Sequence, residues 1–298
     1  MYPVPLTYFF NFLQIDAKAR PWLLAGMADA GAKHLVLTDS LLADILKDAA
    51  QLNAIEKEMA DAGLDFVDSH AQFGLDIDMN LLNKPQRRAM IARHKLALEI
   101  AHYFHVETIT IHVGNNRTQE LATLPLQNHI DAVTDSLAQL LPTAEELGIT
   151  ICIENIWTQT TTPERLLEWK KMFPTDALGF CYDAGHANIM SKGKLYPEGS
   201  ACTSWKYTTP DTPQWDDCIL EKMLPEIVTC HLHDNTGEND QHNLPGKGNI
   251  DWQNIRKKLM TAPRLKCIQS EVSLTPNQIA LPQLIGKFEE LFPECRDI

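Results

Sequence analysis

The feature that most constrains this chain is a regular alternation between short β-branched runs and longer stretches with helical spacing of apolar residues. Seven continuous apolar runs predict buried strands. A weaker run precedes them, and the eight ranges are 4–10, 33–39, 64–70, 107–114, 149–155, 177–183, 226–234 and 265–273. Continuous apolar runs are typical of parallel strands that are covered on both faces. The alternation therefore predicts an α/β fold built on a parallel sheet.

The segments between these runs carry apolar residues at three-and-four spacing, which indicates one buried helical face. An early series is Leu42, Ile45, Ala49, Leu52, Ile55 and Met59, and a later one is Ile130, Val133, Leu137, Leu140 and Ala144. Eight strand–helix units within 298 residues fit a (β/α)8 TIM barrel, which typically takes roughly 250 residues. A doubly wound open sheet is the alternative arrangement.

No low-complexity tract or Ser/Gly-rich linker divides the chain, so we expect residues 1–298 to form a single domain. One segment, 190–218, breaks the alternation because it is longer than an ordinary connection and rich in Gly, Pro and Thr. It also carries Trp205, Tyr207 and Trp215. We expect this segment to be an ordered lid over the substrate, and packing of its aromatic rings onto the outer helices is the alternative.

Charge and composition restrict the partners. The formal net charge of −13 at pH 7 disfavours a surface that neutralises nucleic-acid phosphates or anionic lipid. The N-terminal stretch lacks the basic region and cleavage site of a secretory signal, and no apolar run approaches the ~20 residues of a membrane span. Seven cysteines have neither zinc-ribbon spacing nor the density of a disulfide framework. We therefore expect a cytoplasmic protein with reduced thiols and a small-molecule partner.

Side chains that bind metals or transfer protons stand at the ends of six consecutive predicted strands. Because all strands of a barrel point their carboxyl ends at one mouth, these side chains should converge there. Any one of them alone is more typical of a hydrogen-bonded strand end, but buried carboxylates and imidazoles gathered together need a compensating cation or protons. A mixed His/Asp/Glu set favours Zn²⁺ or Mn²⁺. The residues are His70, His112, Glu154, Asp183, His186, His231 and Glu271.

The stretch 228–252, VTCHLHDNTGENDQHNLPGKGNIDW, holds further donors. His231 comes from the strand, and Asp240 and His242 return from the following loop as a D-x-H pair aimed at the same mouth. His233 should share the facing of His231, because residues two apart in a strand lie on one side. We interpret His233 as a substrate contact or as a hydrogen-bond donor to a metal ligand.

The end of this stretch, GKGNIDW, admits two interpretations. In one, Gly246 and Gly248 form a tight turn and Asp251 caps the following helix. In the other, the glycines cradle a phosphate. The turn and cap are favoured.

Four strand-end residues and two stretches that follow strands carry a resemblance to a known family. The residues are Glu154, Asp183, His231 and Glu271, and the stretches are YDAGHANI after the sixth strand and HLHDNTGENDQHNLPGKGNIDW after the seventh. Together they resemble the xylose isomerase-like TIM-barrel superfamily. The resemblance is to its sugar phosphate isomerase/epimerase branch, which is related to endonuclease IV-type enzymes, and it covers essentially the whole predicted barrel. In isomerases and epimerases of this group such a tetrad holds one divalent metal. The abasic-site endonucleases hold three zinc ions through five further positions, which the resemblance matches to His70, His112, His186, Asp240 and His242.

The resemblance implies a metal-dependent sugar, sugar phosphate or keto-acid isomerase or epimerase. Glu154 and Glu271 would serve as base and acid, moving a proton through an enediolate. The alternatives are an endonuclease IV-like multinuclear zinc phosphodiesterase, a metal-dependent dehydratase, and a non-catalytic barrel that binds metal or senses sugar. The predicted mouth loops 71–83, 114–123 and 234–250 contribute only Lys84 at a margin, Arg117 and Lys247 as cations, which disfavours nucleic acid. The 190–218 segment adds three lysines but also four acidic residues. Pairing into homo-oligomers is also typical of such barrels.

Overall fold

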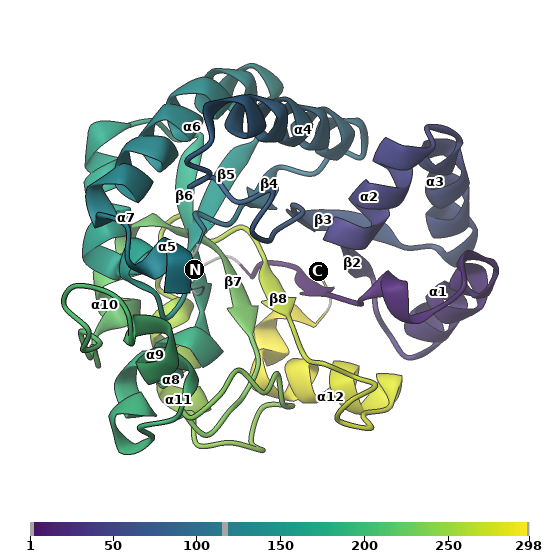
Figure 1. The fold of residues 1–298 in the computed structure, drawn as a ribbon. Helices are drawn as coiled ribbons and strands as arrows, with labels where there is room; N and C mark the ends of the chain where they lie inside the picture. Colours follow the sequence, from purple (N-terminus) through teal and green to yellow (C-terminus); the bar gives the residue numbers. More distant parts are fainter. Residues whose placement is uncertain (1–2, 115–118, 297) are drawn as a thin grey trace.

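A computed structural model describes residues 3–114, 119–296 and 298 and confirms the barrel. Eight parallel strands form one closed ring in chain order, and the ring closes through the pairing of β1 with β8, which excludes the open sheet. Figure 1 shows the strands at the centre of the molecule with the helices outside them. Every strand lies within its predicted range; the bounds are β1 Leu6–Tyr8, β2 His34–Leu37, β3 Asp65–His70, β4 Thr108–Thr110, β5 Thr150–Glu154, β6 Leu178–Asp183, β7 Ile227–Leu232 and β8 Ile268–Ser270.

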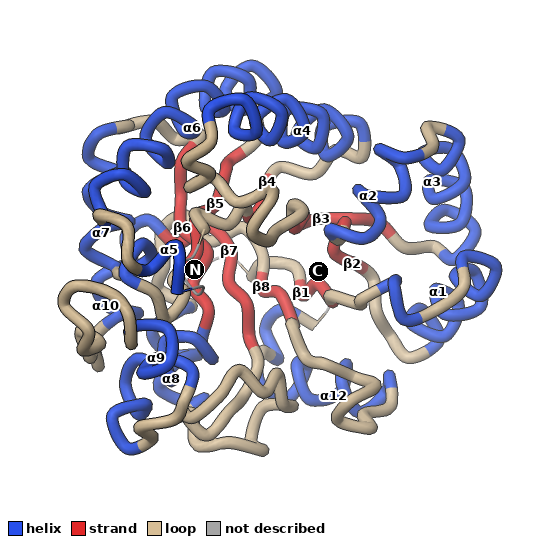
Figure 2. Tube along the Cα trace, in the orientation of Figure 1, coloured by secondary structure: helices blue, strands red, loops and turns tan. Residues whose placement is uncertain are grey.

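Helices follow the strands and cover the outer face of the ring, as Figure 2 shows in blue around the red strands. Their bounds are α1 Arg20–Asp29, α2 Asp39–Lys47, α3 Ala50–Ala62, α4 Lys84–Tyr103, α5 Gln119–Ala122, α6 Leu126–Leu147, α7 Pro163–Met172, α8 Ala184–Lys192, α9 Ser200–Trp205, α10 Ile219–Met223, α11 Trp252–Leu259 and α12 Leu281–Leu291. Most of the buried apolar side chains belong to one core cluster between these helices and the strands.

The early apolar series is divided between two helices, which the spacing alone did not predict. α2 ends before Asp48, whose backbone is extended at φ −145° and whose carboxylate accepts a hydrogen bond from the backbone N–H of Ala50 at 3.0 Å. Such a side-chain bond to the backbone competes with helix continuation. Ala49 is exposed in the short connection. The later series does form one helix face, since Val133, Leu137, Leu140 and Ala144 are buried in α6.

A buried carboxylate ties the strands together inside the barrel. Asp68 on β3 accepts hydrogen bonds from the hydroxyl groups of Thr108 on β4 and Thr229 on β7, each at 2.6 Å. Burial raises the pKa of Asp68. Because Asp68 and Thr229 each precede a mouth histidine by two residues, His70 and His231, this tie fixes the spacing of the two strands that present them.

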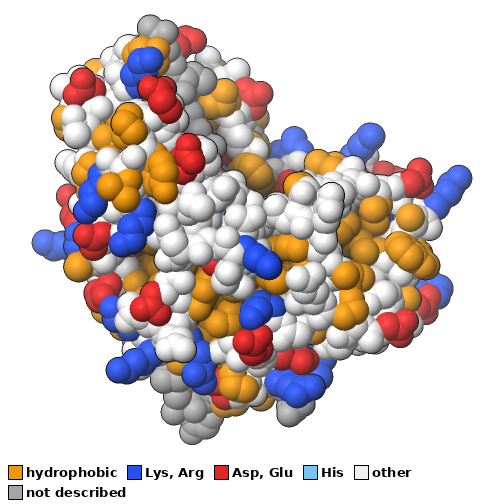
Figure 3. Space-filling model, turned by 90° about the horizontal axis from the view of Figure 1, so that it is seen from below, with side chains coloured by type: hydrophobic (Ala, Val, Ile, Leu, Met, Phe, Trp, Pro, Cys, Tyr) orange, Lys and Arg blue, Asp and Glu red, His pale blue; other side chains and the backbone are white. Residues whose placement is uncertain are grey.

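The distribution of charged side chains and the state of the cysteines are those expected from the composition. On the face shown in Figure 3, basic and acidic side chains are interspersed rather than gathered by sign. Within the described ranges, no helix combines the length and apolarity needed to cross a membrane. All seven cysteines are free, which confirms that their spacing does not encode a disulfide framework.

Candidate metal centre

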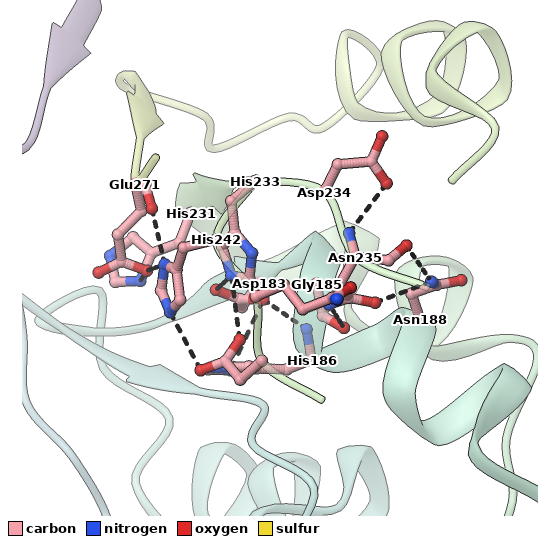
Figure 4. Close-up of polar contacts among 12 residues, drawn as sticks. Asp183, Gly185, His186, Asn188, His231, His233, Asp234, Asn235, His242 and Glu271 are labelled. Atoms are coloured by element: carbon pink, nitrogen blue, oxygen red, sulfur yellow. Dashed lines mark hydrogen bonds and ion pairs between the residues drawn. The ribbon is translucent and has the colours of Figure 1, made fainter. Parts of the chain in front are cut away.

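Four of the predicted residues meet at the carboxyl ends of neighbouring strands. Glu154 ends β5, Asp183 ends β6, His231 lies in β7 and Glu271 follows β8. One ligand atom of each lies within 4.8 Å of those of the other three. Figure 4 shows His231 and Glu271 side by side, with Asp183 close to them. This spacing is compact enough for a single ion to contact all four side chains.

The carboxylates of this group surround one histidine nitrogen. His231 Nδ1 lies 3.2 Å from Glu154 Oε1 and 3.4 Å from Glu271 Oε2. Burial lowers the pKa of His231, but Glu271 and then Glu154 outweigh burial and raise it to about 10. Burial likewise opposes ionisation of Glu154, yet the neighbouring histidines hold its pKa well below the usual range. Protons on the rings thus balance the buried carboxylates, and a divalent cation would compete with those protons.

His70 and His112 lie beside this group. His70 donates its Nδ1–H to the backbone carbonyl of Ala71 at 2.8 Å. Burial, with His112 and His231 nearby, lowers the pKa of His70 to about 3, so its ring is neutral and can offer Nε2 as a ligand. His70, Glu154 and His231 form a second group with ligand atoms within 4.8 Å. His112 Nε2 lies 3.1 Å from Glu154 Oε2.

Asp240 joins two further histidines on the other side of the mouth. Its Oδ2 lies 3.4 Å from His186 Nε2 and 3.0 Å from His242 Nε2. Burial opposes protonation of both rings, but Asp183 and Asp240 raise the pKa of His186 well above its usual range. Asp240 raises the pKa of His242 to about 9. The D-x-H pair predicted from the sequence therefore reaches the same mouth as the residues on the strands.

His233 is buried behind these residues. Its ring stacks on that of His242 with centroids 3.9 Å apart, and its Nε2 lies 3.2 Å from Asp183 Oδ2. The ring is fully buried and does not line the cavity described below. A Cβ atom on Gly185 would lie 2.0 Å from this ring, so only glycine leaves room for it there. His233 occupies the position of a hydrogen-bond donor to Asp183.

The loop that carries Asp240 and His242 is held by a carboxylate next to His233. Asp234 is fully buried, and Figure 4 shows it pointing away from the cluster of histidines. Its two oxygens accept four hydrogen bonds. The donors are the backbone N–H groups of Asn235 (2.9 Å), Ile250 (3.3 Å) and Gly246 (2.7 Å) and the indole N–H of Trp252 (2.9 Å). One side chain thus joins the beginning of the loop to its end.

The GKGNIDW sequence closes this loop as a turn followed by a helix cap. Gly246 has φ +90°, a conformation that side chains rarely adopt. A Cβ on Gly248 would lie 2.1 Å from the carbonyl oxygen of Asn235. Asp251 accepts a hydrogen bond from the backbone N–H of Asn254 at 3.1 Å and begins α11. The predicted turn and cap are confirmed.

A cavity of ≈ 480 Å³ opens at the mouth, and Glu154 and Glu271 of the candidate metal group line it. Apolar side chains that the sequence analysis did not select form part of its wall, and they follow β1 and β3: Phe9, Phe10, Phe73 and Leu75. The signals for them were aromatic residues directly after strand ends, in YFF and AQFGL. Asp39 also lines the cavity. It is the first residue of α2 and follows β2 and Thr38, the N-cap of that helix. Asp39 was not predicted as a site residue, because the predicted set of strand-end donors begins with the third strand.

The segment 190–218 is ordered, but none of its residues lines this cavity. Trp205 is 1% exposed and donates its indole N–H to the carbonyl of Trp157 at 2.9 Å. Trp215 packs against Gly193, whereas Tyr207 is 42% exposed. Closure of the segment over a substrate stays a prediction.

Of the predicted mouth cations, Lys84 and Lys247 do not line the cavity. Arg117 lies outside the described residues.

The profile of the xylose isomerase-like TIM barrel family matches residues 24–264. The chain belongs to this family. A curated relative, uncharacterized protein MJ1311 of Methanocaldococcus jannaschii, is 27% identical over 194 residues, which are 64% of this chain and 58% of that protein. The chain therefore spans less than two thirds of that relative's length.

Solved structures share the fold at low sequence identity. A D-tagatose 3-epimerase-like protein is 22% identical with a TM-score of 0.67, covering 90% of each chain. The 3-keto-D-glucoside 4-epimerase YcjR of E. coli is 13% identical with a TM-score of 0.70, covering 97% of this chain and 98% of that one. The IOLI protein with a bound zinc atom is 16% identical with a TM-score of 0.67, covering 99% of this chain and 100% of that one.

Proposed function

We propose that this xylose isomerase-like barrel is a divalent-metal-dependent isomerase or epimerase that acts on a sugar, sugar phosphate or keto-acid by proton transfer through an enediolate. The observation that carries the proposal is the position of two glutamates that both approach Nδ1 of the buried His231, at 3.2 and 3.4 Å, and both line a cavity of ≈ 480 Å³. The epimerases among the similar folds support it.

The proposed metal ligands are Glu154, Asp183, His231 and Glu271. Their ligand atoms fit one ion, and the donor set of one imidazole and three carboxylates suits Zn²⁺ or Mn²⁺. More than one ion is compatible with the adjacent groups that contain His70 and His186. A bound cation polarises a substrate carbonyl and lowers the barrier to removal of the neighbouring proton.

The proton is moved by side chains of this chain. Glu154 ends β5 and Glu271 follows β8, so that β6 and β7 separate them in the ring. Both line the cavity, so each can face a substrate carbon from its own side. We infer that one removes the proton and the other returns it. Return to the same carbon from the opposite side produces an epimer, and return to the adjacent carbon produces an isomer.

The remaining predicted residues take supporting roles in this proposal. His70, His112, His186, Asp240 and His242 line the cavity and contact substrate hydroxyl groups. His233 donates to Asp183 and fixes the orientation of that carboxylate. The segment 190–218 acts as a lid through Tyr207. Trp205 anchors the segment through its bond to Trp157, whose ring packs edge-on against His186 with centroids 4.7 Å apart.

The proposal is tested by metal analysis of the purified protein, followed by a turnover screen over ketoses, keto-acids and their phosphates with added Mn²⁺ or Zn²⁺. We expect at least one stoichiometric divalent ion and turnover of at least one carbonyl sugar. Protein that binds neither ion after reconstitution contradicts the proposal.

A second candidate, a multinuclear zinc phosphodiesterase, is favoured by one observation. Besides the tetrad, the described residues include three further groups able to hold an ion, among them His70–Glu154–His231 and Asp183–His186–His233. The screen therefore includes a duplex that contains an abasic site. Cleavage of that duplex, together with two or three bound zinc ions per chain, would place this candidate first.

A further inference from the structure

Asn155 joins the ends of two strands that carry proposed metal ligands. It follows Glu154 directly in the chain and is 1% exposed. Both polar atoms of its side chain contact the backbone of one residue, Asp183. The amide N–H₂ donates to the carbonyl oxygen of Asp183 at 2.9 Å, and the amide oxygen accepts the N–H of Asp183 at 2.9 Å. Asn155 is thus linked to Glu154 through the chain and to Asp183 through two hydrogen bonds.

The pairing of β5 with β6 explains why a side chain is needed at this point. The last residue of β5 that pairs is Glu154, and its partner on β6 is Cys181. Asp183 lies two residues farther along β6, where it pairs with His231 of β7 but with no residue of β5. A buried backbone N–H or C=O without a partner is costly. Because an asparagine amide carries the same donor and acceptor as a peptide group, Asn155 takes the place that a further residue of β5 would have.

The backbone of Asn155 holds a third site residue. His186 Nδ1 lies 3.0 Å from the carbonyl oxygen of Asn155, and because a carbonyl only accepts, Nδ1 carries the donated proton. The carboxylate of Asp183 in turn accepts the backbone N–H of His186 at 2.6 Å and caps α8. Asn155, Asp183 and His186 therefore form a closed triangle of contacts, in which displacement of one residue moves the other two.

The Asp183 carboxylate is oriented at both of its oxygens. Its Oδ1 accepts the backbone N–H of His186, and its Oδ2 lies 3.2 Å from His233 Nε2. These contacts fix the carboxylate relative to β6 and β7, whereas the amide of Asn155 fixes the backbone of Asp183 relative to the end of β5. A metal centre depends on such outer contacts, because its ligand atoms must be held within a few tenths of an ångström.

We propose, on the basis of the function proposed above, that Asn155 is a positioning residue of the metal centre. Its amide holds Asp183 at a fixed distance from Glu154, so that carboxylates from two different strands can bind the same divalent ion. Asn155 itself supplies no ligand atom. Its contribution is the affinity of the centre for the ion.

The test measures the Zn²⁺ affinity of the full chain by competition with a chelator. Asn155→Leu keeps a branched side chain of similar shape and removes both hydrogen bonds to Asp183. We expect it to lower the Zn²⁺ affinity about 10- to 100-fold, which is the usual effect of losing a contact that orients a metal ligand. Asn155→Ala should do the same and avoids any steric conflict that leucine introduces. The visible absorption spectrum of bound Co²⁺, which depends on the arrangement of the ligands, should change in both variants.

Asn188→Leu is the matched control, because Asn188 is also a buried asparagine, 8% exposed. Its amide donates to the side chains of Asn235 at 2.9 Å and Asn249 at 2.7 Å rather than to a proposed ligand. This variant should lower the urea midpoint and retain the Zn²⁺ affinity of the unsubstituted protein.

An unchanged Zn²⁺ affinity in both Asn155 variants overturns the inference and leaves the proposed function standing. An equal loss of affinity in Asn188→Leu also overturns it, because the loss would then follow from lower stability. If the unsubstituted protein binds neither Zn²⁺ nor Mn²⁺, the proposed function and the inference both fail.

Discussion

Replacing Asp234 by Asn probes the loop that brings Asp240 and His242 to the mouth. The substitution keeps the size of the side chain but turns one acceptor oxygen into an N–H₂ group. Whichever way the amide is oriented, that group faces two N–H donors, either Gly246 and Trp252 or Asn235 and Ile250. Leaving a buried donor without its acceptor costs about 1–3 kcal/mol, so two such losses amount to about 2–6 kcal/mol.

This cost is a large part of the 5–15 kcal/mol that typically stabilises a folded domain. Urea unfolding followed by circular dichroism should therefore show a clearly lower midpoint for Asp234→Asn with a similar slope. Asp251→Asn is the matched control in the same loop, because Asn caps a helix about as well as Asp and should change stability by less than about 0.5 kcal/mol. If Asp234→Asn is within about 1 kcal/mol of this control, the four-donor arrangement does not hold the loop.

Three further predictions concern the metal, the lid and the pH dependence. Glu271→Gln should weaken binding of the divalent ion at least about 10-fold in a chelator competition, with little change in the urea midpoint of the metal-free protein; unchanged affinity would remove Glu271 from the ligand set. Trp205→Ala should lower the free energy of unfolding by about 3–5 kcal/mol because the ring is buried. If the segment 190–218 is a lid, Tyr207→Ala should raise KM without lowering the free energy of unfolding. Unaltered kinetics in Tyr207→Ala would assign the segment to the scaffold. Burial lowers the pKa of His94 to about 4, so as the pH falls the unfolded chain protonates this ring before the folded protein does. The free energy of unfolding should therefore fall between about pH 6.5 and about pH 4, by about 3 kcal/mol for this residue. His94→Gln should flatten that part of the stability profile, and an equally steep fall in the variant would show that His94 is not its cause.

The parts of this protein that could be predicted are those encoded by local pattern. Continuous apolar runs locate the strands, and parallel strands in a barrel must send their last residues to one mouth, so Glu154, Asp183 and Glu271 could be brought together without a structure. The interruption between α2 and α3 was hidden because Asp48 preserves the helical spacing of apolar residues around it while its side chain bonds to Ala50.

Residues whose roles depend on distant partners could not be assigned from sequence. Asp234 stands beside three other polar residues in the chain, and only the fold shows that its oxygens reach Gly246 and Trp252. An aromatic residue in a long segment has the same local pattern whether it faces substrate or core, so the burial of Trp205 against Trp157 was not predictable. Asp39 has an ordinary position at the start of a helix, and the cavity alone distinguishes it.

The central claim is that Glu154 and Glu271 carry a proton to and from a carbon next to the substrate carbonyl. Turnover of the substrate in D₂O by the unsubstituted, metal-loaded protein tests it most directly, because a carboxylic acid exchanges its proton with solvent once the site opens. Mass spectrometry of the product, after exchangeable hydroxyl deuterium is washed back, should show deuterium on that carbon. A product that retains its original hydrogen after many turnovers would contradict the two-glutamate mechanism and indicate a hydride shift.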